Sequence, residues 1–432
     1  MGQPASNDRP AGIAGAPGGP PRLDALDGLR GLAALAVVFF HFTARWTVPN
    51  NGESLYPYGD MFPPEAQPWF NMMIIGVNLF FLISGFVMVI MLRHSTGLAD
   101  FALRRLSRIW PVLILAATLT TLIIHASGIH ERFDSISDWS VSKFEFVSSI
   151  LMIDPAFLGG VVGKPGNTWV DGVYWTLWVD IRFYVLVALT YWLFSGRTGF
   201  AAAWIAVQLA SIALLAVTAF TPANPHWSLH VVLQPHYLPW FTLGIAACYL
   251  RQDRNYRAGF ALALTGLAAL VLDAVVMSEL LFHGSVWVQL GIYSVFIGLF
   301  ALAIVRSPVL KVFTQPWVLT LGLASFPLYI FHERVGIIAM NLMADLGVPA
   351  LLTLPLVIAG AVAIALVIHR FVEMPVRRRL LTTFQPATRR LEKAMPFLKF
   401  RRQPAVSPPA SATPAVEAGR IRPAPEAAGQ YR

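Results

Sequence analysis

Apolar stretches of about 18 to 25 residues recur along the chain, and this pattern limits what it can fold into more than any other feature. As a helix, each stretch is long enough to cross a hydrocarbon layer of about 30 Å. Only 13% of the residues are charged, about half the share usual in soluble domains. The sequence therefore predicts an all-α integral membrane protein and excludes a water-soluble globule. We expect about ten transmembrane helices, over residues 29–46, 70–92, 107–127, 174–195, 199–220, 229–250, 257–278, 285–305, 317–343 and 350–372.

The net charge of +9 comes from basic residues that gather in alternate connections between the predicted spans. The intervening connections are acidic or uncharged. This distribution follows the positive-inside rule, so both termini are expected in the cytoplasm and the number of spans is expected to be even. The same distribution argues for a lipid bilayer and against nucleic acid as the partner. The basic positions are Arg22, Arg30, Arg93, Arg104, Arg105, Arg108, Arg197, Arg251, Arg254, Arg257, Arg306, Lys311 and Arg377 to Arg379.

The chain is predicted to consist of one membrane domain, residues 23–380, between two tails. Residues 1–22 are rich in Gly, Pro and Ala and lack the apolar stretch of a cleavable signal peptide, which predicts a disordered cytoplasmic tail. Residues 381–432 read as a basic, Pro/Ala-rich cytoplasmic tail. The longest connection, residues 128–173, is expected on the external side. Its apolar stretch at 144–159 is too short to span, which indicates an interfacial or re-entrant piece beside a site, or a lid that packs on the bundle.

The first predicted span contains two ionisable residues. Ionisable groups inside a membrane are energetically costly, so each is a candidate functional residue. Arg30 and His41 are separated by eleven steps of about 100°, so both side chains are expected on one face of the helix, about 16 Å apart along its axis. An arginine near the cytoplasmic mouth can hold a phosphate, and a histidine deeper in the span can take a proton at neutral pH. The alternatives are a positive-inside anchor for Arg30 and a hydrogen-bonded packing residue for His41.

The fourth predicted span carries Asp180 at a depth similar to that of His41. A carboxylate beside an imidazole fixes its tautomer and raises its basicity. We therefore predict that Asp180 lies within hydrogen-bond reach of His41, directly or through one water. The competing interpretation is a structural ion pair of Asp180 with Arg182 or another arginine.

Three ionisable residues, His332, Glu333 and Arg334, follow one another in the ninth predicted span. Such a run seldom faces lipid, so it either lines a polar cavity that reaches a substrate or satisfies its own members within the bundle. Cys248 is the only cysteine, which excludes an internal disulfide and a cysteine-based metal site. No bound metal is predicted.

The order and spacing of five segments resemble the membrane-bound acyltransferase 3 family over about residues 22–380. The resemblance implies a core of about ten helices in a bacterial inner (plasma) membrane. It also implies transfer of an acyl group, commonly acetyl, from cytoplasmic acyl-coenzyme A to a hydroxyl of a surface polysaccharide, lipid or small molecule. The five segments are Leu26 to Gly31 leading to His41, Gly76 to Phe86, Phe101 to Pro111, Tyr174 to Tyr184, and Ser325 to His332.

On this interpretation His41 is the general base and Asp180 orients it, while Arg30 and His41 correspond to the family's essential pair. Acyl-coenzyme A is expected as a donor substrate, with no permanently bound cofactor. The donor's phosphates are expected on Arg30, Arg104, Arg105 and Arg108. The acceptor is expected to contact Ser84, Trp175, Tyr184, His332 and Glu333, and Ser84 or Tyr184 is a candidate dipole for the oxyanion.

Two positions depart from the family's usual pattern. Asp180 stands where Glu is usual, which shortens the reach to His41, and Asn78 stands where Asp is frequent. Two rival functions are open. A transporter or flippase would use the intramembrane charges as a substrate path without consuming acyl-coenzyme A, and an export or scaffold subunit would leave His41 and Asp180 without a role.

Overall fold

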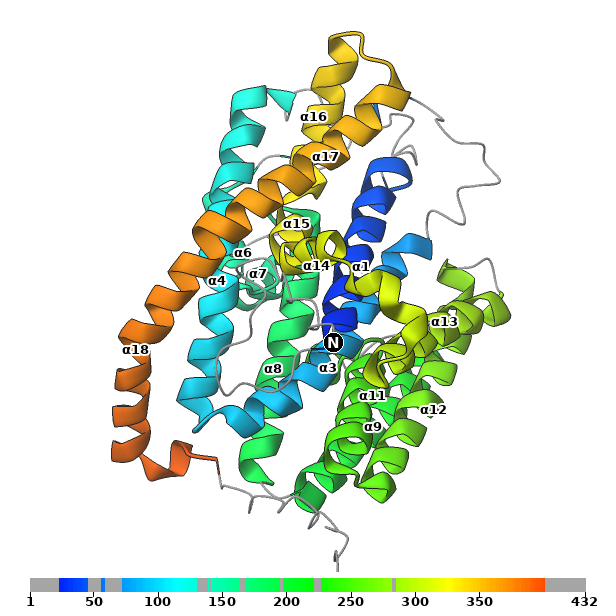
Figure 1. Cartoon of the computed structure of the whole chain (residues 1–432), viewed down its shortest axis with the longest axis vertical. Helices are drawn as coiled ribbons and strands as arrows, with labels where there is room; N and C mark the ends of the chain where they lie inside the picture. Colours follow the sequence, from blue (N-terminus) through cyan, green and yellow to red (C-terminus); the bar gives the residue numbers. More distant parts are fainter. Residues whose placement is uncertain are drawn as a thin grey trace, which may run out of the picture.

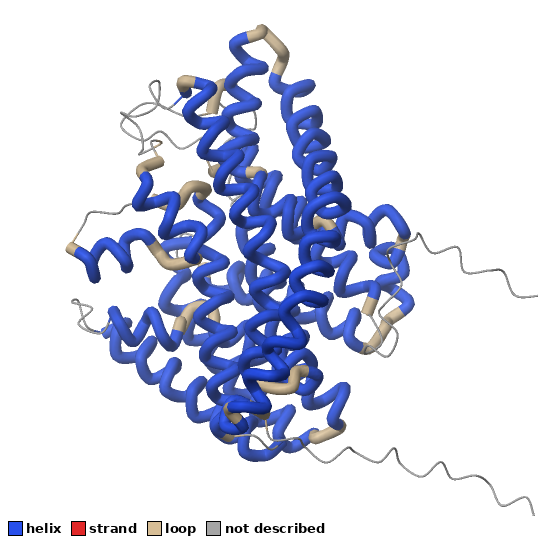
Figure 2. Tube along the Cα trace, turned by 90° about the vertical axis from the view of Figure 1, so that its left-hand side faces the viewer, coloured by secondary structure: helices blue, strands red, loops and turns tan. Residues whose placement is uncertain are grey.

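The computed structural model describes residues 23–45, 56–58, 72–129, 139, 141–163, 168–194, 197–220, 227–281 and 285–400. Over these ranges the chain is a bundle of helices without a strand, as Figures 1 and 2 show. The predicted all-α class is confirmed. Among the described residues, eight helical segments are long and apolar enough to cross a membrane: Asp24–Thr43, Met73–His94, Leu98–Ser127, Gly172–Leu193, Gly199–Val217, Tyr256–Met277, Val286–Ile304 and Ala350–Ala394.

The elements in chain order are α1 (Asp24–Thr43), η2 (Met72–Ile75), α3 (Gly76–His94), α4 (Leu98–Ser127), α6 (Lys143–Leu151), α7 (Pro155–Val162), η3 (Gly172–Tyr174), α8 (Trp175–Leu193), α9 (Arg197–Phe220), α10 (Trp227–Leu233), α11 (Leu238–Cys248), η4 (Tyr249–Asp253), α12 (Tyr256–Leu281), α13 (Val286–Ile304), η5 (Pro308–Thr314), α14 (Pro316–Leu323), α15 (Ser325–Phe331), α16 (Glu333–Asp345), α17 (Ala350–Ile368), η6 (His369–Glu373), α18 (Met374–Ala394) and η7 (Pro396–Leu398).

Two of the predicted spans are interrupted in the structure. The stretch at 229–250 is divided into α10 and α11, because Gln234 adopts a positive φ of 45° and precedes Pro235, which disfavours helical backbone at the residue before it. The stretch at 317–343 is divided into α14, α15 and α16, with breaks at Ala324 and His332. The prediction of one continuous helix in each of these regions was wrong.

Glycines let the central helices approach backbone to backbone. A Cβ at Gly85 of α3 would overlap the carbonyl of Phe241 in α11, and one at Gly244 of α11 would overlap the carbonyl of Leu82 in α3. Small residues at such crossings are typical of membrane helices, which associate by close packing rather than by the hydrophobic effect. The α3–α11 crossing is therefore fixed by the absence of side chains at two positions.

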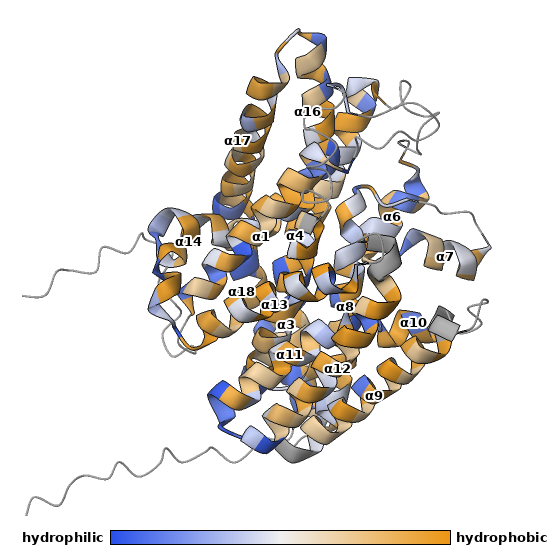
Figure 3. Ribbon diagram, turned by 90° about the vertical axis from the view of Figure 1, so that its right-hand side faces the viewer, coloured by the Kyte–Doolittle hydropathy of each residue, from blue (hydrophilic) through white to orange (hydrophobic). Residues whose placement is uncertain are grey.

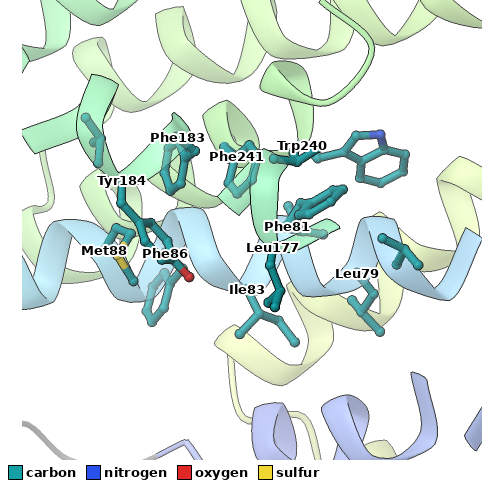
Figure 4. Packing of buried hydrophobic residues seen from close by; sticks show 14 of the residues in the cluster. Leu79, Phe81, Ile83, Phe86, Met88, Leu177, Phe183, Tyr184, Trp240 and Phe241 are labelled. Atoms are coloured by element: carbon teal, nitrogen blue, oxygen red, sulfur yellow. The ribbon is translucent and has the colours of Figure 1, made fainter. Parts of the chain in front are cut away.

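Aromatic rings fill the space beside this crossing. The rings of Phe183 and Phe241 stack with centroids 3.8 Å apart, and Figure 4 shows them facing each other near Phe81 and Tyr184. Rings of this size bury a large apolar area and set the spacing of the helices that carry them. The cluster therefore fixes α8 against α3 and α11, which positions the polar residues on the same helices.

Large apolar side chains remain exposed along the outer helices. Leu264 on α12 is 69% exposed and Leu351 on α17 is 80% exposed, and Figure 3 shows that most residues of both helices are apolar. A soluble protein rarely presents such surface, whereas a lipid-facing helix does. These faces fit a multi-pass membrane protein.

Two regions outside the continuous spans carry helical structure. Residues 128–173, expected to be a loop, contain α6 and α7, which meet at 114° and together are apolar enough for a broken span or a re-entrant loop. At the other end, α18 runs to Ala394, so the boundary predicted at residue 380 falls within a helix. The predicted tail at 1–22 lies outside the described residues.

Candidate active site

A cavity of about 90 Å³ lies between α1, α3, α4, α8 and α15. It brings together six of the residues predicted from the sequence to form the site. Apolar side chains such as Phe80 and Val87 complete the wall, so the charged groups face one another in an environment of low polarity. The six residues are Arg30, Ser84, Arg105, Arg108, Asp180 and Tyr184.

Asp180 belongs to this cavity. The Ser84 hydroxyl lies 3.4 Å from Asp180 Oδ1, and the charges of Arg105 and Arg30 act on the carboxylate. The predicted direct hydrogen bond between Asp180 and His41 is not formed over the described ranges. Asp180 also does not pair with Arg182, which donates to the carbonyls of Val231 at 2.7 Å and Trp178 at 3.1 Å.

Arg105 is the most buried of the cavity arginines, with 6% of its surface exposed. Its guanidinium lies over the ring of Tyr184, 5.2 Å from the centroid, and its Nη2 atom has no hydrogen-bond partner. A buried N–H group without a partner is costly, so it indicates a place where a ligand oxygen fits.

Five predicted site residues lie outside the cavity lining, and two of these, Arg104 and Trp175, make contacts elsewhere. Arg104 forms an ion pair with Asp100 one turn earlier on α4, at 2.9 Å. Trp175 packs its ring on Tyr237, with centroids 5.4 Å apart. Arg104 is one position from Arg105 but points about 100° away on the helix, which explains its different environment.

His41 lies in a second cluster, formed with residues at the junction of α15 and α16. Its Nδ1 atom is 2.9 Å from the carbonyl of Val37 and 3.0 Å from His332 Nε2. Its Nε2 atom is 3.7 Å from Glu333 Oε1. All three ionisable side chains are buried. The partners of His41 are thus the consecutive residues His332 and Glu333, which lie at the break between α15 and α16.

The hydrogen bonds assign the tautomers of both imidazoles. His332 Nδ1 faces the carbonyls of Tyr329 at 2.8 Å and Leu328 at 3.1 Å, so it carries a hydrogen, and Nε2 of the neutral ring is an acceptor. His41 Nδ1 then faces two acceptors, Val37 O and His332 Nε2, and must donate. His41 Nε2 is left with its lone pair, which is the state required of a general base.

Asp171 and Gly172, before α8, shape the side of the cluster where Glu333 lies. Asp171 Oδ2 accepts from the backbone N–H of Arg334 at 3.1 Å, and a Cβ at Gly172 would overlap Glu333 Oε2. Burial, together with the nearby charge of Glu333, raises the pKa of Asp171 well above its usual value. Sequence reasoning missed both residues, because their only signal was an Asp-Gly pair in a long connection.

Tyr329 lies between the two clusters. It lines the arginine cavity, and its ring centroid is 5.9 Å from that of His332. The charges of both Asp180 and Glu333 act on its hydroxyl. The arginine cavity and the histidine cluster are therefore neighbours along α1, with Arg30 and His41 about 16 Å apart along the helix.

The fold and these clusters define a multi-pass membrane protein with a polar, buried site. A family model described as an acyltransferase domain matches residues 23–370, so the chain belongs to the acyltransferase 3 family. The chain is also similar to Nodulation protein 10 of Rhizobium leguminosarum bv. viciae, with 28% identity over 120 residues, which are 26% of this chain and 32% of that relative. No solved structure matches.

Proposed function

We propose that the protein is an O-acyltransferase that moves an acyl group, most simply acetyl, from cytoplasmic acyl-coenzyme A to a hydroxyl of an extracytoplasmic acceptor such as a surface polysaccharide. The observation that carries this proposal is the geometry of His41, whose Nδ1 faces two acceptors and whose Nε2 lies beside Glu333, next to a cavity lined by arginines. The arginine cavity suits an anionic donor, and the His41 cluster suits removal of a hydroxyl proton.

The donor site is proposed to use the three arginines of the cavity. Over the ranges that the structure describes, Arg30 and Arg108 form no hydrogen bond or ion pair, and Arg105 keeps one N–H group open. Guanidinium groups bind phosphate oxygens through paired hydrogen bonds. Acyl-coenzyme A would act as a substrate here, with its diphosphate on the arginines and its thioester directed along α1 toward His41.

The chemistry requires one base. His41 Nε2 takes the proton of the acceptor hydroxyl while that oxygen attacks the thioester carbonyl. The carbon–sulfur bond then breaks, the acyl group stays on the acceptor oxygen, and the leaving coenzyme A thiolate takes the proton from the His41 imidazolium, which restores the base. Glu333 stabilises the transient imidazolium, and His332 holds the ring through Nδ1. Ser84 and Tyr184 line the arginine cavity beside Asp180 and Arg105, so in this arrangement they are proposed to contact the diphosphate end of the donor rather than its carbonyl.

The test compares His41→Ala with a matched control. His94 makes the same Nδ1 contact to the carbonyl four residues earlier, at 2.7 Å, but is exposed at the end of α3. In cells that produce either variant at equal levels, mass spectrometry of surface glycans should show ester-linked acyl groups only with His94→Ala. We expect His41→Ala to reduce transfer by about 10²- to 10⁴-fold, the usual contribution of a positioned base.

Full transfer by a correctly inserted His41→Ala protein would exclude His41 as the base. The rival function, a transporter or flippase, makes a different prediction. It requires movement of a substrate without release of free coenzyme A thiol, which a thiol reagent measures directly in membranes.

A further inference from the structure

The arginine cluster continues beyond the cavity into a helix that lies outside the family match. The match ends at residue 370, and α18 begins at Met374. Arg377, in the first turn of α18, lies close enough to Arg108, Arg105 and Arg104 for their charges to repel. Figure 1 shows α18 alongside α4, which carries those three arginines.

Arg377 is only partly neutralised by the protein, because the charge of Glu373 acts on it while the charges of Arg108 and Arg104 oppose it. Over the described ranges its guanidinium forms no ion pair or hydrogen bond, and its Nε atom is buried without a partner. The acid one turn earlier, Glu373, is bonded to His369 at 2.7 Å, and Asp100 is bonded to Arg104. Several partly buried like charges with open N–H groups are costly unless an anion joins them.

The position of α18 is fixed by contacts near its far end. Glu392 is 1% exposed and accepts from the backbone N–H of Asp100 at 3.0 Å and from the Thr96 hydroxyl. It thereby satisfies a free N–H group at the start of α4, where a negative charge also complements the helix dipole. Phe400 packs on Tyr191, with centroids 5.1 Å apart. These contacts hold α18 in register with α4, so the location of Arg377 is defined.

We propose that Arg377 extends the donor site and binds the 3′-phosphate on the ribose of acyl-coenzyme A, an inference that rests on the proposed function. The cavity arginines Arg30, Arg105 and Arg108 lie nearest the path to His41 and suit the diphosphate. Arg377 does not line the cavity. Its charge acts on the arginines of α4, whereas Arg30 shares α1 with His41, so Arg377 suits the most distant anion of a donor whose thioester points toward His41.

The experiment measures equilibrium binding of coenzyme A and of dephospho-coenzyme A, which lacks the 3′-phosphate, to the purified full-length protein in detergent. The wild type should bind coenzyme A more tightly. Arg377→Ala should weaken coenzyme A binding by about tenfold or more, the scale of one charge-assisted contact, and remove the preference between the two ligands. Arg377→Lys should keep part of the preference. Arg378→Ala, an exposed neighbour, should bind like the wild type.

The outcomes separate the inference from the proposed function. A wild type that prefers coenzyme A, with the same preference in Arg377→Ala, overturns the role of Arg377 and leaves the donor site intact. A wild type that binds both ligands equally also overturns it. A wild type that binds neither ligand overturns the proposed function together with this inference.

Discussion

The smallest unit of the proposed chemistry is a pair of imidazoles. His332 accepts the Nδ1 hydrogen of His41, and this contact leaves the lone pair of His41 on Nε2. His332→Leu removes that acceptor, whereas His332→Gln places an amide oxygen near the position of Nε2. We expect His332→Leu to lower kcat on the order of 10- to 100-fold, the usual cost of losing an orienting contact, and His332→Gln to lower it less. Steady-state kinetics at saturating donor check this, and equal losses in the two variants would contradict the assignment.

Adjacent arginines on α4 make a second comparison at the residue scale. Arg105 lines the cavity with an open N–H group, whereas Arg104 is paired with Asp100. Arg105→Ala should raise the apparent KM for the donor by about 10- to 100-fold, with a smaller change in kcat, because it removes a contact to a charged group. Arg104→Ala should change this KM less. A larger KM effect at Arg104 would place the phosphates on the other face of α4.

At the scale of elements, sequence patterns predict what is local and miss what is distant. Apolar length predicts α1, α3 and α13 because each continuous helix is visible within its own residues. A hydropathy window averages over the breaks at Gln234 and His332 and cannot detect them. The contact between His41 and His332 joins positions 291 residues apart. Spacing within one helix predicts that Arg30 and His41 share a face. The partner of His41 lies on another helix, and the sequence pattern predicted Asp180 for it, a contact that is not formed over the described ranges.

The junction of η3 with α16 supplies a test of element packing. Gly172→Ala places a methyl group against Glu333 Oε2, so the Glu333 carboxylate must shift from its position beside His41. We expect transfer to fall by more than about tenfold while the protein still inserts, since one displaced side chain costs only about 1 to 3 kcal/mol of stability. Gly160→Ala is the control, because nothing lies within 4 Å of its Cβ. Equal activity of the two variants, measured at matched thermal stability in detergent, would count against a role for the Glu333 position.

At the scale of the whole molecule, the proposed mechanism assigns the two clusters to two substrates that come from opposite sides of the membrane. Arg30 lies near the start of α1, on the side that the positive-inside rule assigns to the cytoplasm. His41 is about 16 Å further along a helix that crosses a layer of about 30 Å, so the proposed base lies at or beyond the midplane. A donor with its phosphates on the arginines and an extended arm would reach His41 without its nucleotide leaving the cytoplasmic side.

This arrangement predicts transfer across the membrane. In sealed inside-out vesicles, acyl-coenzyme A added to the medium meets the cytoplasmic face, and an acceptor trapped in the lumen meets the opposite face. We expect the trapped acceptor to be acylated in these vesicles and not in right-side-out vesicles given the same external donor, because the charged nucleotide does not cross the bilayer. Mass spectrometry of the recovered acceptor measures the result, and His41→Ala vesicles give the background. Acylation only when donor and acceptor share the cytoplasmic face would contradict the cross-membrane path and leave His41 as a base that works from one side.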